Sequence, residues 1–187
     1  MVKPTQSRSF HWRAAVGLLV LGPTGVLVLF STPIVHQGTL LHWGFQSLSW
    51  VFLTLYATFR IWATLYIGGR KDRVLQTEGA YSVTRNPLYV GSACYAVAVA
   101  LFFQSLLLLL ASVAVILFYS LTVVPSEEKV LRRLFGASFD EYARQTPRFF
   151  PNLSRYRRPK EVVVDLDSIR REARRLFIAA ADKERRR

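Results

Sequence analysis

The chain is poor in the residues that cross-link a fold or bind metals. Its 187 residues include one cysteine, Cys94, and three histidines, His11, His36 and His42. A single cysteine cannot form an internal disulfide, and no cysteines and histidines have the spacing of a zinc finger. We therefore expect neither a disulfide scaffold nor a metal site.

Acidic residues are outnumbered by basic ones, which leaves a net charge of +13. Yet 51% of the residues are hydrophobic, and the mean hydropathy is +0.23. A soluble domain rarely combines these values, because its surface must be polar. The apolar and basic residues alternate in blocks, and no RNA-binding aromatic motif accompanies the basic ones. This pattern is typical of a membrane protein with basic flanks.

The apolar blocks predict an all-α, polytopic membrane protein with four transmembrane helices. A helix needs roughly 20 residues to cross a bilayer. The expected spans are residues 14–35, 44–67, 88–103 and 106–124, the last two forming a helical hairpin. A cleaved signal peptide is the alternative for the first span, but its length and the presence of Pro23 and Pro33 argue against cleavage.

Lys and Arg residues are absent from the links between spans one and two and between spans three and four. They occur before the first span, between the second and third, and after the fourth. By the positive-inside rule, both termini and the 68–87 loop are expected in the cytoplasm. We expect a membrane-embedded domain over residues 1–155 and a basic cytoplasmic tail over residues 156–187 that contacts anionic lipid headgroups.

The sequence becomes polar after the fourth span, where a new helix is expected. Ser126 is a suitable N-cap for it. Glu127 and Glu128 fall in the first turn, where the helix dipole favours carboxylates, and Gly136 is a suitable C-cap.

Residues 78–91 combine polar, aromatic and small side chains between two apolar spans. Pro87 disfavours the α conformation for Asn86 and suits a first helical position, so a loop is expected to become a helix at Pro87. The free N–H groups of that helix start, next to Arg85, suit an anion such as a carboxylate. Gly91 allows a ligand or a second helix to approach. A membrane-interface turn with tyrosine anchors and a snorkelling arginine is the alternative.

The predicted hairpin brings residues 78–91 and 126–151 together at one membrane surface. The two blocks carry Tyr81, Arg85, Asn86 and Tyr89 on one side and Glu127, Glu128, Tyr142 and Arg148 on the other. Such a set suits a ligand with a carboxylate and positive charges. Helix capping by the two glutamates and snorkelling by Arg148 are the alternative interpretations.

The spacing of these residues resembles that of the integral-membrane methyltransferases. The matching pattern is Gly79-x-Tyr81-x-x-x-Arg85-Asn86-Pro87-x-Tyr89-x-Gly91, then Glu127-Glu128, then Phe135-Gly136-x-x-Phe139-x-x-Tyr142 and Pro147-Arg148-Phe149-Phe150-Pro151. The resemblance covers residues 44–153 and includes the isoprenylcysteine carboxyl methyltransferases, their bacterial relatives and the phospholipid N-methyltransferases.

The resemblance implies that the chain binds S-adenosylmethionine at the cytoplasmic face. The cofactor contacts that it implies fall on Tyr81, Arg85, Asn86, Pro87, Tyr89, Gly91, Glu127 and Glu128, and it makes Tyr81, Tyr142 and Arg148 candidates for either cofactor or substrate. The cofactor's carboxylate suits Arg85, its ammonium suits either glutamate, and its sulfonium suits aromatic faces. The chain has no Gly-x-Gly-x-x-Gly motif, which argues against a soluble Rossmann-type methyltransferase.

Asn86 stands where the family pattern has a histidine. Asparagine can hydrogen-bond but cannot act as a general base near neutral pH. A carboxylate acceptor needs no deprotonation, so this departure favours it over a thiol or a protonated amine, unless Glu127 or Glu128 serves as the base. Catalysis is then expected to rest on positioning, with Arg85 and Glu128 as the leading catalytic residues.

Arg60 is unusual because it lies inside the second expected span, about 10 Å from the cytoplasmic end by helix rise. Either its side chain snorkels to the membrane surface, or it faces the bundle interior as a catalytic or substrate-binding residue. In the second case it suits the carboxylate of an acceptor.

The sequence therefore predicts S-adenosylmethionine-dependent methyl transfer to a lipophilic or membrane-delivered acceptor, with a carboxylate favoured. The alternatives are a phospholipid amine or a small thiol as the acceptor, or a non-catalytic membrane scaffold with a lipid-binding basic tail. Neither a specific nucleic acid nor a metal is expected among the partners.

Overall fold

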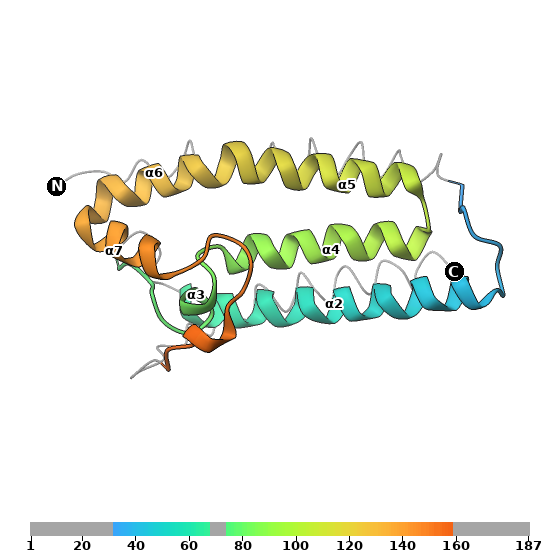
Figure 1. The fold of residues 1–187 in the computed structure, drawn as a ribbon, viewed down its shortest axis with the longest axis horizontal. Helices are drawn as coiled ribbons and strands as arrows, with labels where there is room; N and C mark the ends of the chain where they lie inside the picture. The colour runs from blue at the N-terminus through green and yellow to red at the C-terminus, as the bar shows by residue number, and fades with distance from the viewer. Residues whose placement is uncertain (1–31, 68–73, 159–187) are drawn as a thin grey trace, which may run out of the picture.

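The computed structural model describes residues 32–67 and 74–158, and within these ranges it is all-helical, without β-strands (Figure 1). The helices are α2 (Leu40–Ile67), α3 (Ala80–Val83), α4 (Pro87–Phe103), α5 (Leu106–Phe118), the π-helical η1 (Tyr119–Val123), α6 (Val124–Phe135), α7 (Ala137–Gln145) and the 3₁₀-helical η2 (Leu153–Arg155). The expected all-α class is confirmed for this part of the chain, in which two long apolar helices and one shorter apolar helix lie where three of the four spans are expected.

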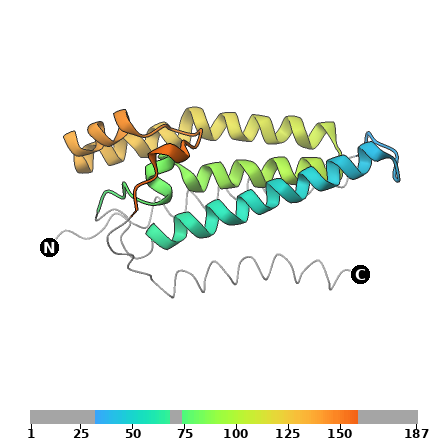
Figure 2. The same ribbon diagram turned by 60° about the horizontal axis from the view of Figure 1, so that its bottom comes forward.

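Three helical rods lie side by side, with α4 between α2 and the continuous rod α5–η1–α6 (Figures 1 and 2). Neighbouring rods run in opposite directions, and small side chains join them. The Ser49 hydroxyl of α2 donates to the Ala98 carbonyl of α4 at 2.8 Å. The Ser112 hydroxyl of α5 donates to the Ala96 carbonyl at 3.1 Å. Each bond satisfies a hydroxyl that would otherwise be unpaired in an apolar setting.

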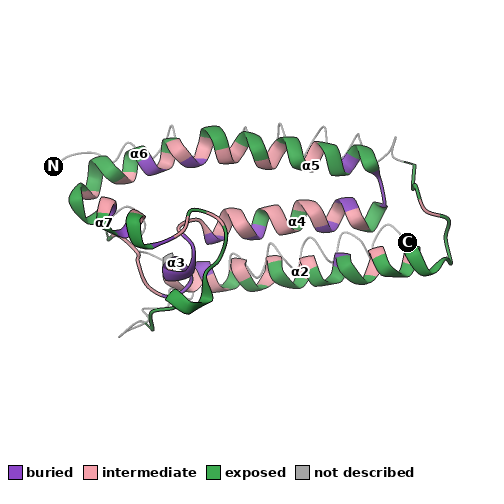
Figure 3. Cartoon of the chain, in the orientation of Figure 1, coloured by how far each residue is buried: buried purple, intermediate pink, exposed green. Residues whose placement is uncertain are grey.

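The outer surfaces of the rods are apolar. Leu40–Tyr66 and Leu106–Phe135 are long and apolar enough to cross a membrane, and Pro87–Phe103 is a shorter apolar helix. Along these rods Trp50, Leu110 and Leu121 are 59%, 59% and 73% exposed, respectively. Figure 3 shows that few residues are buried along α2 and α5, whereas buried residues gather around α3. An apolar exterior of this kind is suited to lipid.

Two of the expected spans correspond to described helices, and one lies mostly outside the described residues. The second begins at Leu40 rather than Gly44, because the Thr39 hydroxyl caps the helix by accepting from the His42 N–H at 3.2 Å. The third begins at Pro87, as expected. Of the first span, residues 14–31 are outside the described residues, and residues 32–35 form no helix. Residues 68–73 and 159–187 are also outside the described residues.

The expected end of the fourth span is wrong. Instead of stopping near Val124 and restarting at a Ser126 cap, the chain is helical from Leu106 to Phe135. The Ser126 hydroxyl donates to the Thr122 carbonyl at 2.7 Å and so does not cap a helix. The wider π turn of η1 changes the hydrogen-bond register directly before Pro125, so the rod continues although proline has no backbone N–H to donate.

The two ends of the bundle are closed differently. At one end, which we call the Gln104 end, Gln104 adopts φ +51° and the Ser105 hydroxyl caps α5 by accepting from the Leu108 N–H at 3.4 Å. At the other, which we call the site end, α6 stops at Gly136, with φ +53°, as expected. Helix α7 then folds back along α6 (Figure 1), and its Tyr142 hydroxyl donates to the Tyr81 carbonyl of α3.

Candidate functional site

An ion cluster of Arg85, Glu128 and Arg148 lies at the site end, with its carboxylate buried and the Arg148 side chain 43% exposed. Glu128, in α6, is only 6% exposed. Arg148 donates to it through Nη2 at 2.6 Å and through Nε at 3.3 Å, and Arg85 Nη1 lies 3.4 Å from Glu128 Oε1. One carboxylate is thus held between two guanidinium groups from distant parts of the chain. The two polar blocks expected to meet, residues 78–91 and 126–151, do meet.

The backbone before α4 positions Arg85. Thr84 is extended (φ −149°, ψ 144°) and Asn86 is the N-cap, as the restriction imposed by Pro87 requires. The Asn86 side chain does not cap the helix, and instead its amide donates to the Arg148 carbonyl at 3.1 Å. The residue at the family's histidine position therefore holds the backbone of a neighbouring member of the ion cluster.

Residues 147–157, which we call the strap, lie along residues 79–86. The Arg85 N–H donates to the Pro147 carbonyl at 2.9 Å, the Asn152 N–H to the Val83 carbonyl at 3.0 Å, and the Gly79 N–H to the Arg157 carbonyl at 3.0 Å. The fully buried Thr84 hydroxyl donates to the carbonyls of Arg148 and Phe149, both at 3.2 Å. These bonds fix the spacing between Arg85 and Arg148. Sequence reasoning missed the role of Thr84, because nothing local marks a threonine that pairs with a segment so far along the chain.

Two buried tyrosines, Tyr81 and Tyr142, lie next to the ion cluster, each 8% exposed. The Tyr142 hydroxyl donates to the Tyr81 backbone carbonyl at 2.7 Å. Among the described residues, neither the buried Tyr81 hydroxyl nor the buried Arg85 Nε has a hydrogen-bond partner. Burial raises the pKa of both tyrosines, so both hydroxyls stay protonated at neutral pH and can act as donors.

The charges of Arg60 and Glu127 both affect the pKa of the Tyr81 hydroxyl. After burial, the Glu127 carboxylate is the next cause that raises the pKa of Tyr81, and the Arg60 guanidinium opposes it. Arg60 is half-buried in α2, at the place where α2 crosses α4: a Cβ on Gly91 would lie 3.7 Å from its backbone nitrogen. The structure thus brings Arg60 to the same end of the bundle as the other candidate residues.

Gly79 and Gly91 both serve close packing. Gly79 has φ +61°, and a Cβ there would lie 2.3 Å from Cζ of the Tyr66 ring. A Cβ on Gly91 would lie 3.3 Å from the Phe59 Cβ and 3.4 Å from the Tyr56 carbonyl oxygen. Gly91 therefore faces α2. Of the two roles expected for this glycine, approach of a ligand or approach of a second helix, the structure shows the second.

Tyr89 contacts a ring that sequence reasoning did not select. Its centroid is 6.0 Å from that of Tyr119, with the rings tilted at 47°. Tyr119 is the first residue of η1, and a π turn has no sequence signature that would have revealed the pairing. Pro87 is fully buried at the start of α4, so it shapes the helix start rather than an open surface.

A hollow of about 740 Å³ opens beside the ion cluster. Its lining includes Arg85, Arg144, Pro147, Phe150, Leu153 and Arg155. Arg85 thus borders the hollow while pairing with Glu128. Guanidinium groups next to apolar side chains suit an anion that also has an apolar or aromatic part. Within residues 32–67 and 74–158, no three His, Cys, Asp or Glu side chains gather as they would around a metal ion.

Comparison with known proteins gives three findings. The sequence profile of the phospholipid methyltransferase family matches residues 34–138. The chain is 39% identical over 120 residues to the nickel-cobalt-cadmium resistance protein NccN of Alcaligenes xylosoxydans xylosoxydans, covering 64% of this chain and 55% of NccN. It is 39% identical over 113 residues to the cobalt-zinc-cadmium resistance protein CzcN of Cupriavidus metallidurans, covering 60% of this chain and 51% of CzcN. The chain thus spans about half the length of these curated relatives. No solved structure matches it significantly.

Proposed function

This chain belongs to the phospholipid methyltransferase family, and we propose that it transfers a methyl group from S-adenosylmethionine to a lipophilic or membrane-delivered acceptor. The family match implies a methyltransferase, and the apolar rods suit a membrane protein. We further propose the multi-pass topology expected from the basic residues, with both termini and the site end in the cytoplasm and the tail over residues 156–187 at anionic headgroups.

The ion cluster carries the proposal. Taking charged groups out of water costs several kcal/mol per ion, and a helix end needs only a neutral cap. Here Glu128 is 6% exposed, and the Arg85 side chain is 14% exposed. Buried charges held by several chain segments are typical of a site that binds a charged ligand.

The residues at the site end fit S-adenosylmethionine. Arg85 Nε is a buried donor without a partner in the described part of the chain, and Arg85 borders the hollow, so we assign the cofactor's carboxylate to Arg85. We assign its ammonium to Glu127 or Glu128, and its sulfonium to the faces of the paired rings Tyr89 and Tyr119. When bound, the cofactor supplies an electrophilic methyl group.

The chain's own contribution is then positioning and exclusion of water. Asn86 uses its amide to hold the Arg148 carbonyl and offers no general base. An acceptor that is already ionised, such as a carboxylate, needs none, and we place it first, as in the isoprenylcysteine carboxyl methyltransferases. A phospholipid amine or a small thiol would need a base, for which Glu127 or Glu128 is available. A non-catalytic scaffold remains the alternative from another class.

The test is calorimetric binding of S-adenosylhomocysteine to the full chain in lipid nanodiscs. We expect wild type to bind and Glu128→Gln to weaken binding at least tenfold, about 1.4 kcal/mol. Asp140→Asn is the matched control, since Asp140 lies on α7 and pairs with the half-exposed Arg132, which does not line the hollow, and it should bind as wild type does. Folded wild type that fails to bind would favour the scaffold.

A further inference from the structure

Tyr81 and Tyr142 are equally buried, but only one of their hydroxyls has a structural use. The Tyr142 hydroxyl donates a hydrogen bond to the Tyr81 backbone carbonyl at 2.7 Å. The Tyr81 hydroxyl has no partner among the described residues. Shielding an unpaired polar group from water destabilises the folded state, and a phenylalanine would fill the same space without that penalty. The presence of an unpaired hydroxyl at this buried position is therefore better explained by a ligand that accepts its hydrogen bond.

The surroundings of Tyr81 place this hydroxyl inside the helix bundle. Tyr81 forms one buried cluster with Ala63 of α2 and Ala80 of α3, against which Leu88 of α4 packs. The strap pairs with the backbone of α3 and its neighbours. The hydroxyl is therefore closed off from water, and it lies near enough to Arg60 of α2 and Glu127 of α6 for both charges to act on it.

We infer that the Tyr81 hydroxyl binds the methyl acceptor and selects a carboxylate over an amine or an amide. This inference rests on the proposed function and assigns the acceptor class to a residue. The hydroxyl donates to one carboxylate oxygen and leaves the second free to react. The positive charge of Arg60 favours the ionised acceptor in the same place, while Glu127 offsets part of that charge.

The chemistry explains the selection. A hydrogen bond from the hydroxyl to an ionised carboxylate is roughly twice as strong as one to the neutral carbonyl oxygen of an amide. A protonated amine has no lone pair to accept the hydroxyl's hydrogen bond, and a neutral amine that accepts it loses the lone pair needed for attack. In the carboxylate, a lone pair on the second oxygen forms the new O–CH₃ bond. The S–CH₃ bond breaks, its electron pair stays on sulfur, and the thioether leaves uncharged. No proton moves, so the residues present need not supply a base.

The experiment compares three probes with the same tail: dodecanoate, dodecanamide and dodecylamine. Their dissociation constants are measured for the full chain in nanodiscs. We expect wild type to bind dodecanoate at least tenfold more tightly than dodecanamide, and Tyr81→Phe to reduce that ratio to about threefold or less, with S-adenosylhomocysteine affinity unchanged. The wild-type preference corresponds to at least about 1.4 kcal/mol, and its reduction in Tyr81→Phe to a loss of at least about 0.7 kcal/mol.

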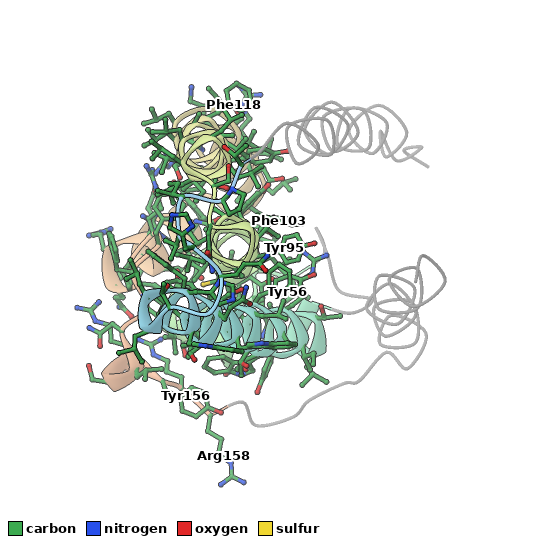
Figure 4. The ribbon with its side chains drawn as sticks, turned by 90° about the vertical axis from the view of Figure 1, so that its right-hand side faces the viewer. Tyr56, Tyr95, Phe103, Phe118, Tyr156 and Arg158 are labelled. Atoms are coloured by element: carbon green, nitrogen blue, oxygen red, sulfur yellow. The ribbon has the colours of Figure 1, made fainter. Side chains whose placement is uncertain are left out.

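The matched control is Tyr95→Phe. Tyr95 lies in α4 with its ring 5.0 Å from that of Tyr56 on α2, and both are labelled in Figure 4. Tyr95→Phe removes a tyrosine hydroxyl from the bundle at a residue to which we assign no role in binding. This variant should therefore keep the wild-type preference for dodecanoate over dodecanamide. Because the ring is retained and the Tyr142 bond goes to the Tyr81 backbone, Tyr81→Phe should also keep the fold.

Each other outcome is decisive. Wild type without a preference for dodecanoate, or a preference that survives in Tyr81→Phe, overturns the inference. A Tyr81→Phe variant that loses S-adenosylhomocysteine binding assigns the hydroxyl to the cofactor and overturns it as well. If wild type fails to bind S-adenosylhomocysteine yet shows a Tyr81-dependent preference, the proposed methyl transfer fails and the carboxylate site stands.

Discussion

The Gln104 end and the site end of the bundle both bury polar groups, but they use them differently. At the Gln104 end, Gln104 and Ser105 are 6% and 4% exposed, and neither is charged. The Gln104 carbonyl accepts from the Ile34 N–H at 3.0 Å, and the side-chain amide lies 2.8 Å from His42 Nδ1. These contacts close one tight turn and tie the preceding segment to it. Neutral groups suffice for that purpose.

The site end buries charges that no turn requires. Glu128 is held by arginines from two other segments, and the strap adds a set of backbone bonds around them. Among the described residues, the Gln104 end has one buried side-chain atom without a partner, Gln104 Oε1, and the site end has two, the Tyr81 hydroxyl and Arg85 Nε. The Gln104 amide nitrogen already contacts His42 Nδ1 and the His42 carbonyl, so the amide is held by the turn through its other atom. At the site end both unpartnered atoms are donors, which suits an anionic ligand.

The largest expected effect is the loss of methyl transfer in Glu128→Gln. The amide removes the negative charge that holds Arg85 and Arg148 in place, so we expect about 10³-fold slower transfer, or about 4 kcal/mol. The rate is measured by transfer of a labelled methyl group into lipid-soluble product. Gln104→Ala, at the other end, should lower the midpoint of thermal unfolding and keep the rate within about threefold. Equal losses in both variants would erase the distinction between the ends.

The next effect separates two glycines of the site end. Gly79→Ala should lower the free energy of unfolding by about 2–4 kcal/mol, because a Cβ 2.3 Å from the Tyr66 ring and a positive φ both oppose it. Gly91→Ala should cost less than about 1 kcal/mol, since its contacts at 3.3 Å and beyond need only small adjustments. Thermal unfolding by calorimetry in one detergent compares them. The reverse order would contradict the packing described for α3 against α2.

The fold was predictable where local rules act. Pro87 determines the start of α4 through its effect on Asn86, and Gly136 ends α6 through its positive φ. The prediction that Ser126 caps a new helix was wrong, because serine is a suitable N-cap only where a helix begins, and here the preceding helix continues. A π turn, which depends on the balance of hydrogen bonds along a whole rod, lets the helix continue through Pro125.

The candidate site was predictable as a set of residues but not as a set of bonds. A hairpin between two polar blocks brings Arg85 and Glu128 to one end, and the sequence shows this directly. It does not show that Arg148 shares the carboxylate, that Asn86 holds a carbonyl, or that the Tyr81 hydroxyl is unpaired. Those features depend on how the strap returns to residues 79–86, which is a long-range contact without a local signal.

A smaller effect separates the two buried tyrosines. Tyr142→Phe should lower the free energy of unfolding by about 1–2 kcal/mol, because it leaves the buried Tyr81 carbonyl without its 2.7 Å donor. Tyr81→Phe should leave the unfolding free energy unchanged or raise it, because it removes an unpaired hydroxyl. Calorimetry without ligand measures both variants. Destabilisation by Tyr81→Phe equal to that by Tyr142→Phe would mean that the Tyr81 hydroxyl has a structural partner.

The smallest effect is a dependence of stability on alkaline pH. An unfolded tyrosine loses its proton near pH 10 (about 10 in model peptides), whereas burial raises the pKa of Tyr81 and Tyr142 in the folded chain. Above that pH the unfolded state binds fewer protons than the folded state, so the free energy of unfolding falls as pH rises, by about 1 kcal/mol per tyrosine up to about pH 11. The unfolding midpoint of Tyr81→Phe should therefore fall less steeply than that of wild type between about pH 9 and pH 11.

Gln104→Ala is the control for this prediction. It removes no titratable group, so its midpoint should fall in parallel with wild type, at a lower temperature throughout. If the unfolding midpoint of Tyr81→Phe also falls in parallel with that of wild type, the Tyr81 hydroxyl ionises as easily in the folded chain as in water. The site end would then have no buried tyrosine donor to distinguish it from the Gln104 end.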